Sequence, residues 1–206
     1  MDAHHYHPIA VGRLKGWLAA AVVLSVTAAA VPQPPERVRL SVPFIRQKGD
    51  WCGPAALAMV LKFHGHEASQ DEIAARVHTV KGGPSPRPVG AQGHPKGGGA
   101  LNLDLKLYAR SLGFHAESRS GKLEDIKREL ADGRPVICTI AQKRGLHYLP
   151  VVGYDEPKKE LLVHLRRPFA SIAFESFQQR WKAAGFWMLT ITPPPAEASP
   201  DSASPY

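Results

Sequence analysis

One cysteine of this chain stands where its thiol could act as a nucleophile. Cys52 begins the run CGPAALAMVLKF, an apolar segment whose Pro54 is tolerated in the first turn of a helix. A cysteine in a first turn lies beside unpaired backbone N–H groups and the positive end of the helix dipole. Both favour the thiolate, which is the nucleophilic form. We therefore predict covalent chemistry at Cys52, with Gly53 leaving space for a substrate.

Two further polar residues could complete such a site. Gln47 precedes Cys52 by five positions, and its side-chain amide could donate to an oxyanion together with the Cys52 backbone N–H. His147 opens the apolar run YLPVVGYD beside Gly145, and a histidine in that position suits a general base. The prediction is a catalytic Cys52–His147 dyad with Gln47 in the oxyanion hole, without a cofactor or a metal ion.

The elements that must position these residues are helical first and strand-like afterwards. The expected helices span 52–63, 69–77, 102–112 and 122–131, after an extended segment, RLSVPFI, that leads to Gln47. The expected strands span 135–141, 148–154, 160–165 and 186–192, with a short helix at 177–183 between the last two. Ser69 and Glu72 form a capping-box pattern, and Asn102 is expected to cap its helix. This order predicts an α+β fold with an antiparallel sheet.

Residues 1–30 are predicted to form a secretory signal peptide. Arg13 and Lys15 precede the apolar run 17–31, which is shorter than the roughly 20 residues of a membrane span and contains three consecutive alanines, 28–30. We expect a periplasmic or secreted protein, cleaved near Ala30. The alternative is an uncleaved signal that anchors the protein at the inner membrane. No cysteine lies near the end of the run, which excludes a bacterial lipoprotein anchor.

One domain is expected between two segments of low apolar content. Residues 31–37 form a proline-rich linker, 38–192 the domain, and 193–206 a disordered tail. The loop 81–99 holds seven glycines but lacks the lysine-serine ending of a phosphate-binding loop, so we expect no nucleotide site. Cys138 alternates with apolar residues and is interpreted as a packed strand residue. A Cys52–Cys138 disulfide is the alternative.

The chain is basic, with 26 lysines and arginines against 18 acidic residues and a net charge of +8. It contains neither a basic helix nor an array of arginines and aromatic residues, so we predict no nucleic-acid partner. Part of the excess lies at 143–144, just before His147, and at 166–167. We expect these charges to rim the site and to attract an acidic polypeptide or an anionic envelope surface.

The order of the motifs resembles that of papain-like cysteine peptidases. The segment QKGDWCGPAA at 47–56 is followed at a distance by GLHYLPVVGYD at 145–155. The pattern is most similar to the bacteriocin-processing, double-glycine leader peptidases and their stand-alone relatives, over roughly 42–187. The resemblance implies that a helical half packs its nucleophile helix on the sheet, with Cys52 as nucleophile, His147 as base and Gln47 as oxyanion-hole donor. It also implies a polypeptide substrate cut after a Gly-Gly pair.

One position departs from the family pattern. Family members carry Asp-Pro after the histidine strand, where the aspartate orients the histidine, but this chain has Arg167-Pro168. Arginine has no acceptor for an imidazole N–H. Asp155, Glu160 or His164, a backbone carbonyl or a water could substitute. The second hypothesis is therefore a catalytically impaired papain-like domain that acts as a binding or assembly module.

Overall fold

The computed structural model describes Met1 and residues 34–49, 51–77, 99–143 and 145–194. Apart from Met1, the predicted signal peptide lies outside the described residues, as do most of the loop 81–99 and of the predicted tail. Within the described ranges, no helix is long and apolar enough to cross a membrane. The described elements run from Arg37 to Thr192, and the predicted division of the chain beyond them stays a prediction.

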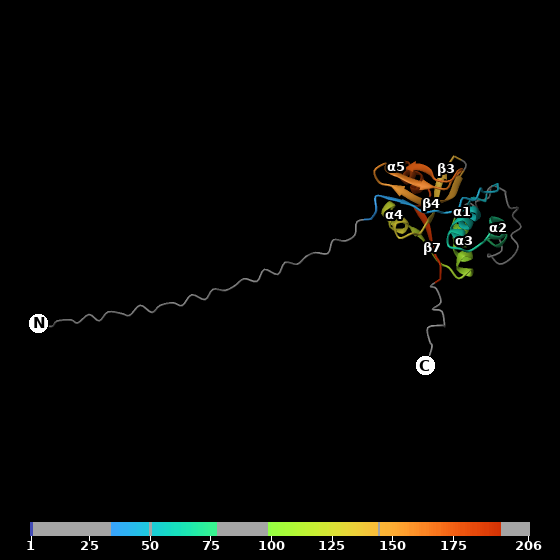
Figure 1. Ribbon diagram of the computed structural model, residues 1–206, viewed down its shortest axis with the longest axis horizontal. Helices are drawn as coiled ribbons and strands as arrows, with labels where there is room; N and C mark the ends of the chain where they lie inside the picture. The colour runs from blue at the N-terminus through green and yellow to red at the C-terminus, as the bar shows by residue number, and fades with distance from the viewer. Residues whose placement is uncertain (2–33, 50, 78–98, 144, 195–206) are drawn as a thin grey trace, which may run out of the picture. The chain divides into compact units, whose positions relative to one another are not determined.

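Helices dominate the first half of the described chain and strands the second, which confirms the predicted α+β class (Figure 1). The helices are α1 (Cys52–Phe63), α2 (Gln70–Val77), α3 (Gly99–Ser111), α4 (Leu123–Ala131) and α5 (Phe174–Lys182). The strands are β1 (Arg37–Arg39), β2 (His115–Ser120), β3 (Val136–Gln142), β4 (Gly145–Asp155), β5 (Glu160–Val163), β6 (Ala170–Ala173) and β7 (Trp187–Thr192).

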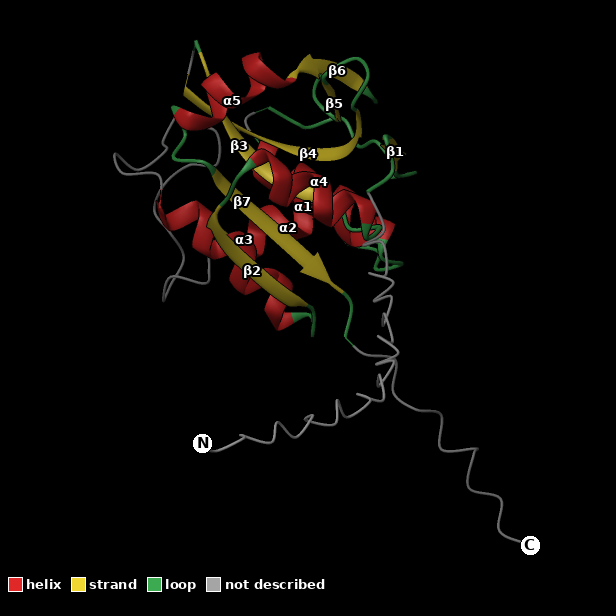
Figure 2. Cartoon of the chain, turned by 90° about the vertical axis from the view of Figure 1, so that its left-hand side faces the viewer, coloured by secondary structure: helices red, strands yellow, loops and turns green. Residues whose placement is uncertain are grey.

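The strands form one antiparallel sheet in the order β2-β7-β3-β4-β5-β6, with β1 paired to β4 beside this path. Four consecutive strands, β3 to β6, make a meander, and Figure 2 shows β2 and β7 side by side. β4 is the longest strand. Its first part pairs with β3, and its last three residues pair with β1, where Gly153 lies opposite Arg39. This strand therefore joins the N-terminal segment to the middle of the sheet.

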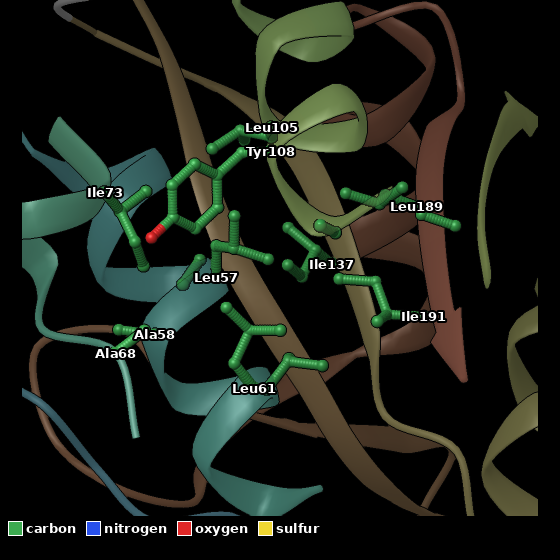
Figure 3. Packing of buried hydrophobic residues seen from close by; sticks show 14 of the residues in the cluster. Leu57, Ala58, Leu61, Ala68, Ile73, Leu105, Tyr108, Ile137, Leu189 and Ile191 are labelled. Atoms are coloured by element: carbon green, nitrogen blue, oxygen red, sulfur yellow. The ribbon is translucent and has the colours of Figure 1, made fainter. Parts of the chain in front are cut away.

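Helices cover both faces of the sheet. Side chains alternate along a strand, so that Ile137 packs with α1, α2 and α3 while its neighbours Val136 and Cys138 pack with α4 and α5. Figure 1 shows the two groups of helices on opposite sides of β4 and β7. In Figure 3, Leu57 and Leu61 of α1 lie against Ile137 and against residues of β7. The sheet thus has an apolar cluster on each face, and a third, smaller cluster joins Ala55 and Met59 of α1 to Val42 and Val152.

The apolar sequence of α1 explains its central place. All ten residues from Cys52 to Leu61 are buried, as expected for a helix without a polar face. α2 begins with the predicted capping box, in which the Glu72 N–H donates to Ser69 Oγ and the Ser69 N–H donates to the Glu72 carboxylate. α2 packs on α1 through Ile73 and Val77, in the same buried cluster as Cys52 and Leu57.

Two predictions about individual elements were incomplete. Asn102 does not cap α3, which begins three residues earlier at Gly99; its side chain instead accepts a hydrogen bond from Tyr148. The strands β2 and β6 were not predicted. They are the two ends of the strand order. β2 is mostly polar, and β6 has only four residues with one large apolar side chain, so neither shows a clear period-two apolar pattern.

Candidate active site

Cys52 is the first residue of α1 and is 8% exposed. Trp51 is the N-cap, and an indole has no acceptor to offer to the N–H groups of the first turn. The first turn also contains no acidic side chain. The positive end of the helix therefore acts on the thiol without a competing anion from the turn itself, which favours the thiolate, whereas the burial of Cys52 opposes it.

Tyr148 connects the Cys52 end of α1 to the strand that carries His147. A Cβ placed on Gly53 would lie 3.6 Å from Tyr148 Cδ2 and 3.4 Å from Leu105 Cδ1. The Tyr148 hydroxyl donates to Asn102 Oδ1 in α3. Burial, and then the nearby Cys52 thiol, raise the pKa of Tyr148. Tyr148 and Leu105 thus pack over Gly53, each at an ordinary van der Waals distance from where a Cβ would lie, and the predicted space for a substrate at Gly53 stays a prediction.

His147 is half-buried near the start of β4, directly before Tyr148. Residues alternate along the strand, so His147 lies on the face of Leu149 and of its cross-strand partner Ile140, while Tyr148 lies on the face of α1. The contact between the helix end and the strand is therefore made by Tyr148. The alternation does not by itself bring His147 to the Cys52 face, so the pairing of the Cys52 thiol with the His147 imidazole stays a prediction that requires the imidazole to turn towards α1 at the start of β4.

Two arginines surround His147 in place of an acid. Burial lowers the pKa of His147 most, and the positive charges of Arg180 and then Arg166 lower it further, to about 4. Arg180 lies in α5 and its Nε donates to the Ala141 carbonyl at the end of β3, 3.1 Å away. His147 is consequently neutral at physiological pH, the form that can accept a proton, but a pKa so far below 7 makes it a weak base.

Arg166 reaches His147 because the β4–β5 pairing continues past the end of β5. Val151 pairs with Val163, and the His164 N–H donates to the Pro150 carbonyl at 2.9 Å, so the next residues run alongside 147–149. The Leu165 N–H then donates to the Arg167 carbonyl in a tight turn. The sequence pointed to Arg167 as the position lacking an acid. The structure adds that Arg166, its neighbour, is the residue whose charge acts on His147.

His164 anchors this turn from behind. Its ring is 1% exposed; one nitrogen bonds the Val42 carbonyl at 2.8 Å, and the other accepts the Phe169 N–H at 3.2 Å. Because Nδ1 is an acceptor, the ring is neutral with its proton on Nε2. Burial lowers the pKa of His164. His164 was a candidate to orient His147, but both of its nitrogens are used elsewhere.

Gln47 lies in the loop before α1, as predicted. Its amide nitrogen donates to the Gly49 carbonyl, 2.6 Å away. An amide carries two N–H donors, so this bond uses one of them and shapes the loop that leads into Cys52. The neighbouring Lys48 N–H donates to Gln70 Oε1, which ties the same loop to α2. The part of Gln47 in an oxyanion hole stays a prediction.

Cys138 is a packed strand residue, as predicted. It is 0% exposed, its burial raises the pKa of the thiol, and it lies on the α4–α5 face of the sheet, away from Cys52. Both cysteines belong to the described residues and neither forms a disulfide, so the alternative of a Cys52–Cys138 bond is wrong. In the part of the chain that the structure describes, no group of three histidine, cysteine or acidic residues could hold a metal ion.

The fold and the helix-borne cysteine define a papain-like cysteine peptidase domain. The family model described as the Peptidase_C39 like family matches residues 39–187. The chain belongs to this family and is a C39-like cysteine peptidase domain, which confirms the resemblance seen in the motifs. A comparison with curated proteins finds no match.

Two solved structures share the fold. A C39-like protein from Bacillus anthracis has a TM-score of 0.59 and 19% identity, over 77% of this chain and 98% of the other. The peptidase domain of Streptococcus ComA, described as a bifunctional ABC transporter of a quorum-sensing pathway, has a TM-score of 0.54 and 22% identity, over 74% and 98% of the two chains. At these identities the likeness concerns the fold.

Proposed function

We propose that this chain is an exported cysteine peptidase that cleaves a polypeptide through Cys52. The observation that carries the proposal is the position of Cys52 as the first residue of the buried helix α1, with the strand of His147 packed on the same helix end through Tyr148. Cys52 Sγ attacks the scissile carbonyl and forms an acyl-enzyme, and the thiol proton passes to His147. Gln47 and the Cys52 N–H stabilise the oxyanion. His147 protonates the leaving amine, and water then releases the acyl group.

The test uses the full chain and its variants. Cys52→Ala and His147→Ala should each abolish cleavage of a short-peptide library, and His147→Ala should slow alkylation of Cys52 at mildly acidic pH. Cys138 is the internal control, because its buried thiol has a raised pKa and should react far more slowly. If Cys52 reacts no faster than a free thiol and no peptide is cut, the peptidase proposal is wrong.

A second candidate function is a binding or assembly module without peptidase activity. The observation that favours it is the pair of cations beside His147, because positive charge opposes the imidazolium that forms during catalysis. The same library distinguishes the two functions. A module would bind peptides that it does not cut, and Cys52→Ala would leave that binding unchanged.

Substrate class and location complete the proposal. The ComA neighbour is a peptidase domain, which supports a polypeptide substrate. The motif resemblance alone supports a small exported polypeptide that is cut after Gly-Gly. Glycine pairs placed at each position of the library test this preference. The signal-like segment 1–30 supports export; N-terminal sequencing of the protein recovered from the periplasm, the medium and the inner membrane separates cleavage near Ala30 from an uncleaved anchor.

A further inference from the structure

Arg180 differs from the other half-buried arginines of the described chain. Arg119 and Arg134 each face carboxylates: Arg119 lies 3.2 Å from Asp125, and Arg134 lies 2.6 Å from Glu129. Among the described residues, Arg180 has no such partner, and its Nε bonds only a backbone carbonyl. A partly buried guanidinium normally finds an anion, because its desolvation must be offset by a charged or hydrogen-bonded partner.

Arg166 and Arg180 approach His147 from two different elements. Arg180 comes from α5 and is fixed at the end of β3, across from Leu146, the residue before His147. Arg166 comes from the turn after β5, on the other side of β4. No described acidic side chain forms an ion pair with either arginine. The base of the proposed peptidase is therefore flanked by two cations that lack counter-charges within the described chain.

We propose that Arg166 and Arg180 bind a carboxylate of the polypeptide substrate next to His147. The inference rests on the proposed function for the identity of the ligand, and it deepens that function by naming a substrate feature. A carboxylate bound there would offset the two positive charges and favour the imidazolium that forms when His147 takes the thiol proton. The substrate would thus supply the negative charge that the segment 165–168 does not. An acidic side chain and a C-terminal carboxylate carry the same chemistry.

The proposal is tested first by binding, which does not depend on hydrolysis. Fluorescent short peptides are prepared in pairs that differ by Glu or Gln at one position at a time, and in a second set that differs by a free or an amidated C-terminus. Their affinities are measured for the full-length Cys52→Ala protein. The peptide that carries the carboxylate should bind about tenfold more tightly than its uncharged partner, because charge-assisted hydrogen bonds to arginine are strong. The position that shows it identifies a side chain or the terminus as the carboxylate.

Arginine variants assign that preference to its residues. In the Cys52→Ala background, Arg166→Gln and Arg180→Gln should each reduce the preference at least severalfold, whereas Arg180→Lys should retain a part of it. Arg110→Gln is the matched control, because Arg110 also donates its Nε to a backbone carbonyl, that of Ala116, in the helical half of the domain. The ratio of two affinities is insensitive to a general loss of folded protein, so it separates recognition from structural damage.

Hydrolysis supplies the second readout. For the wild-type protein, the acid limb of the kcat profile should lie at higher pH with the carboxylate peptide than with its amide counterpart, because the bound anion raises the pKa of His147. Equal affinities within every pair, or a preference unchanged in both glutamine variants, would overturn the carboxylate site. If the carboxylate peptides bind more tightly but no peptide is cut, the carboxylate site is supported and only the peptidase proposal is wrong. If peptides are cut but the carboxylate peptides bind no more tightly, the peptidase proposal is supported and the carboxylate site is wrong.

Discussion

Replacing Arg166 with glutamine should raise the pKa of His147 by a bounded amount. The pKa falls from 6.5 to about 4, a difference of about 2.5, and three causes act in the same direction: burial most, then Arg180, and Arg166 least. The smallest of three contributions is at most a third of the difference, or about 0.8. Arg166→Gln should therefore shift the pKa upward by no more than about 0.8, which raises the imidazolium fraction above the pKa up to about sixfold.

Nuclear magnetic resonance titration of the His147 ring protons measures this change, with His147→Gln used to assign the signal. Arg167→Gln is the matched control: it removes an adjacent, equally exposed charge that is not among the charges acting on His147. An unchanged or lower pKa in Arg166→Gln, or an equal rise in Arg167→Gln, would refute the assignment of Arg166. A rise well above 0.8 would show that Arg166 is not the smallest of the three causes.

Three other substitutions test how the site is held in place. Gly153→Ala should lower the free energy of unfolding by about 1–3 kcal/mol in urea melts, since its Cβ would lie 2.2 Å from the Val38 carbonyl oxygen. Tyr148→Phe should lower the free energy of unfolding by about 1 kcal/mol, because the hydrogen bond to Asn102 is lost. Burial lowers the pKa of His164 in the folded protein below its ordinary value of 6.5, so the unfolded chain takes up a proton more readily. The contribution of His164 to the stability of the fold is therefore present above pH 6.5 and is lost on acidification. His164→Gln should reduce that slope by up to about 1.4 kcal/mol per pH unit.

The sequence was most informative where the chain is buried. The limits of α1 were predicted to the residue, because an unbroken apolar run, a proline in the first turn and a glycine after the last turn leave one way to place the helix. The meander from β3 to β5 was predicted for a similar reason. Its strands are central and consist largely of apolar residues. Cys52 and His147 could be found because each opens such an element.

The surroundings of His147 could not be read in the same way. Arg180 is 33 positions away in the chain and reaches the histidine only because α5 packs across β3. The sequence indicated Arg167 because of its place in a motif. Which of the two adjacent arginines lowers the pKa of His147, however, depends on the turn at 165–167. Asn102 was assigned to a helix cap because that is its commonest local role, and its partner Tyr148 lies 46 positions away.

The pairing of β1 with β4 has a mechanical consequence. The Tyr154 hydroxyl donates to the Pro35 carbonyl, the Glu156 N–H donates to the Glu36 carbonyl, and β1 follows directly. The segment 35–39 is thus bonded to the far end of β4, the strand that carries His147 near its start. A pulling force applied to the chain ahead of Pro35 would therefore be transmitted to β4 before it reached any of the described helices. A chain held ahead of Pro35 and one left free would differ in the force transmitted to β4, and with it in the stiffness of the strand that carries His147.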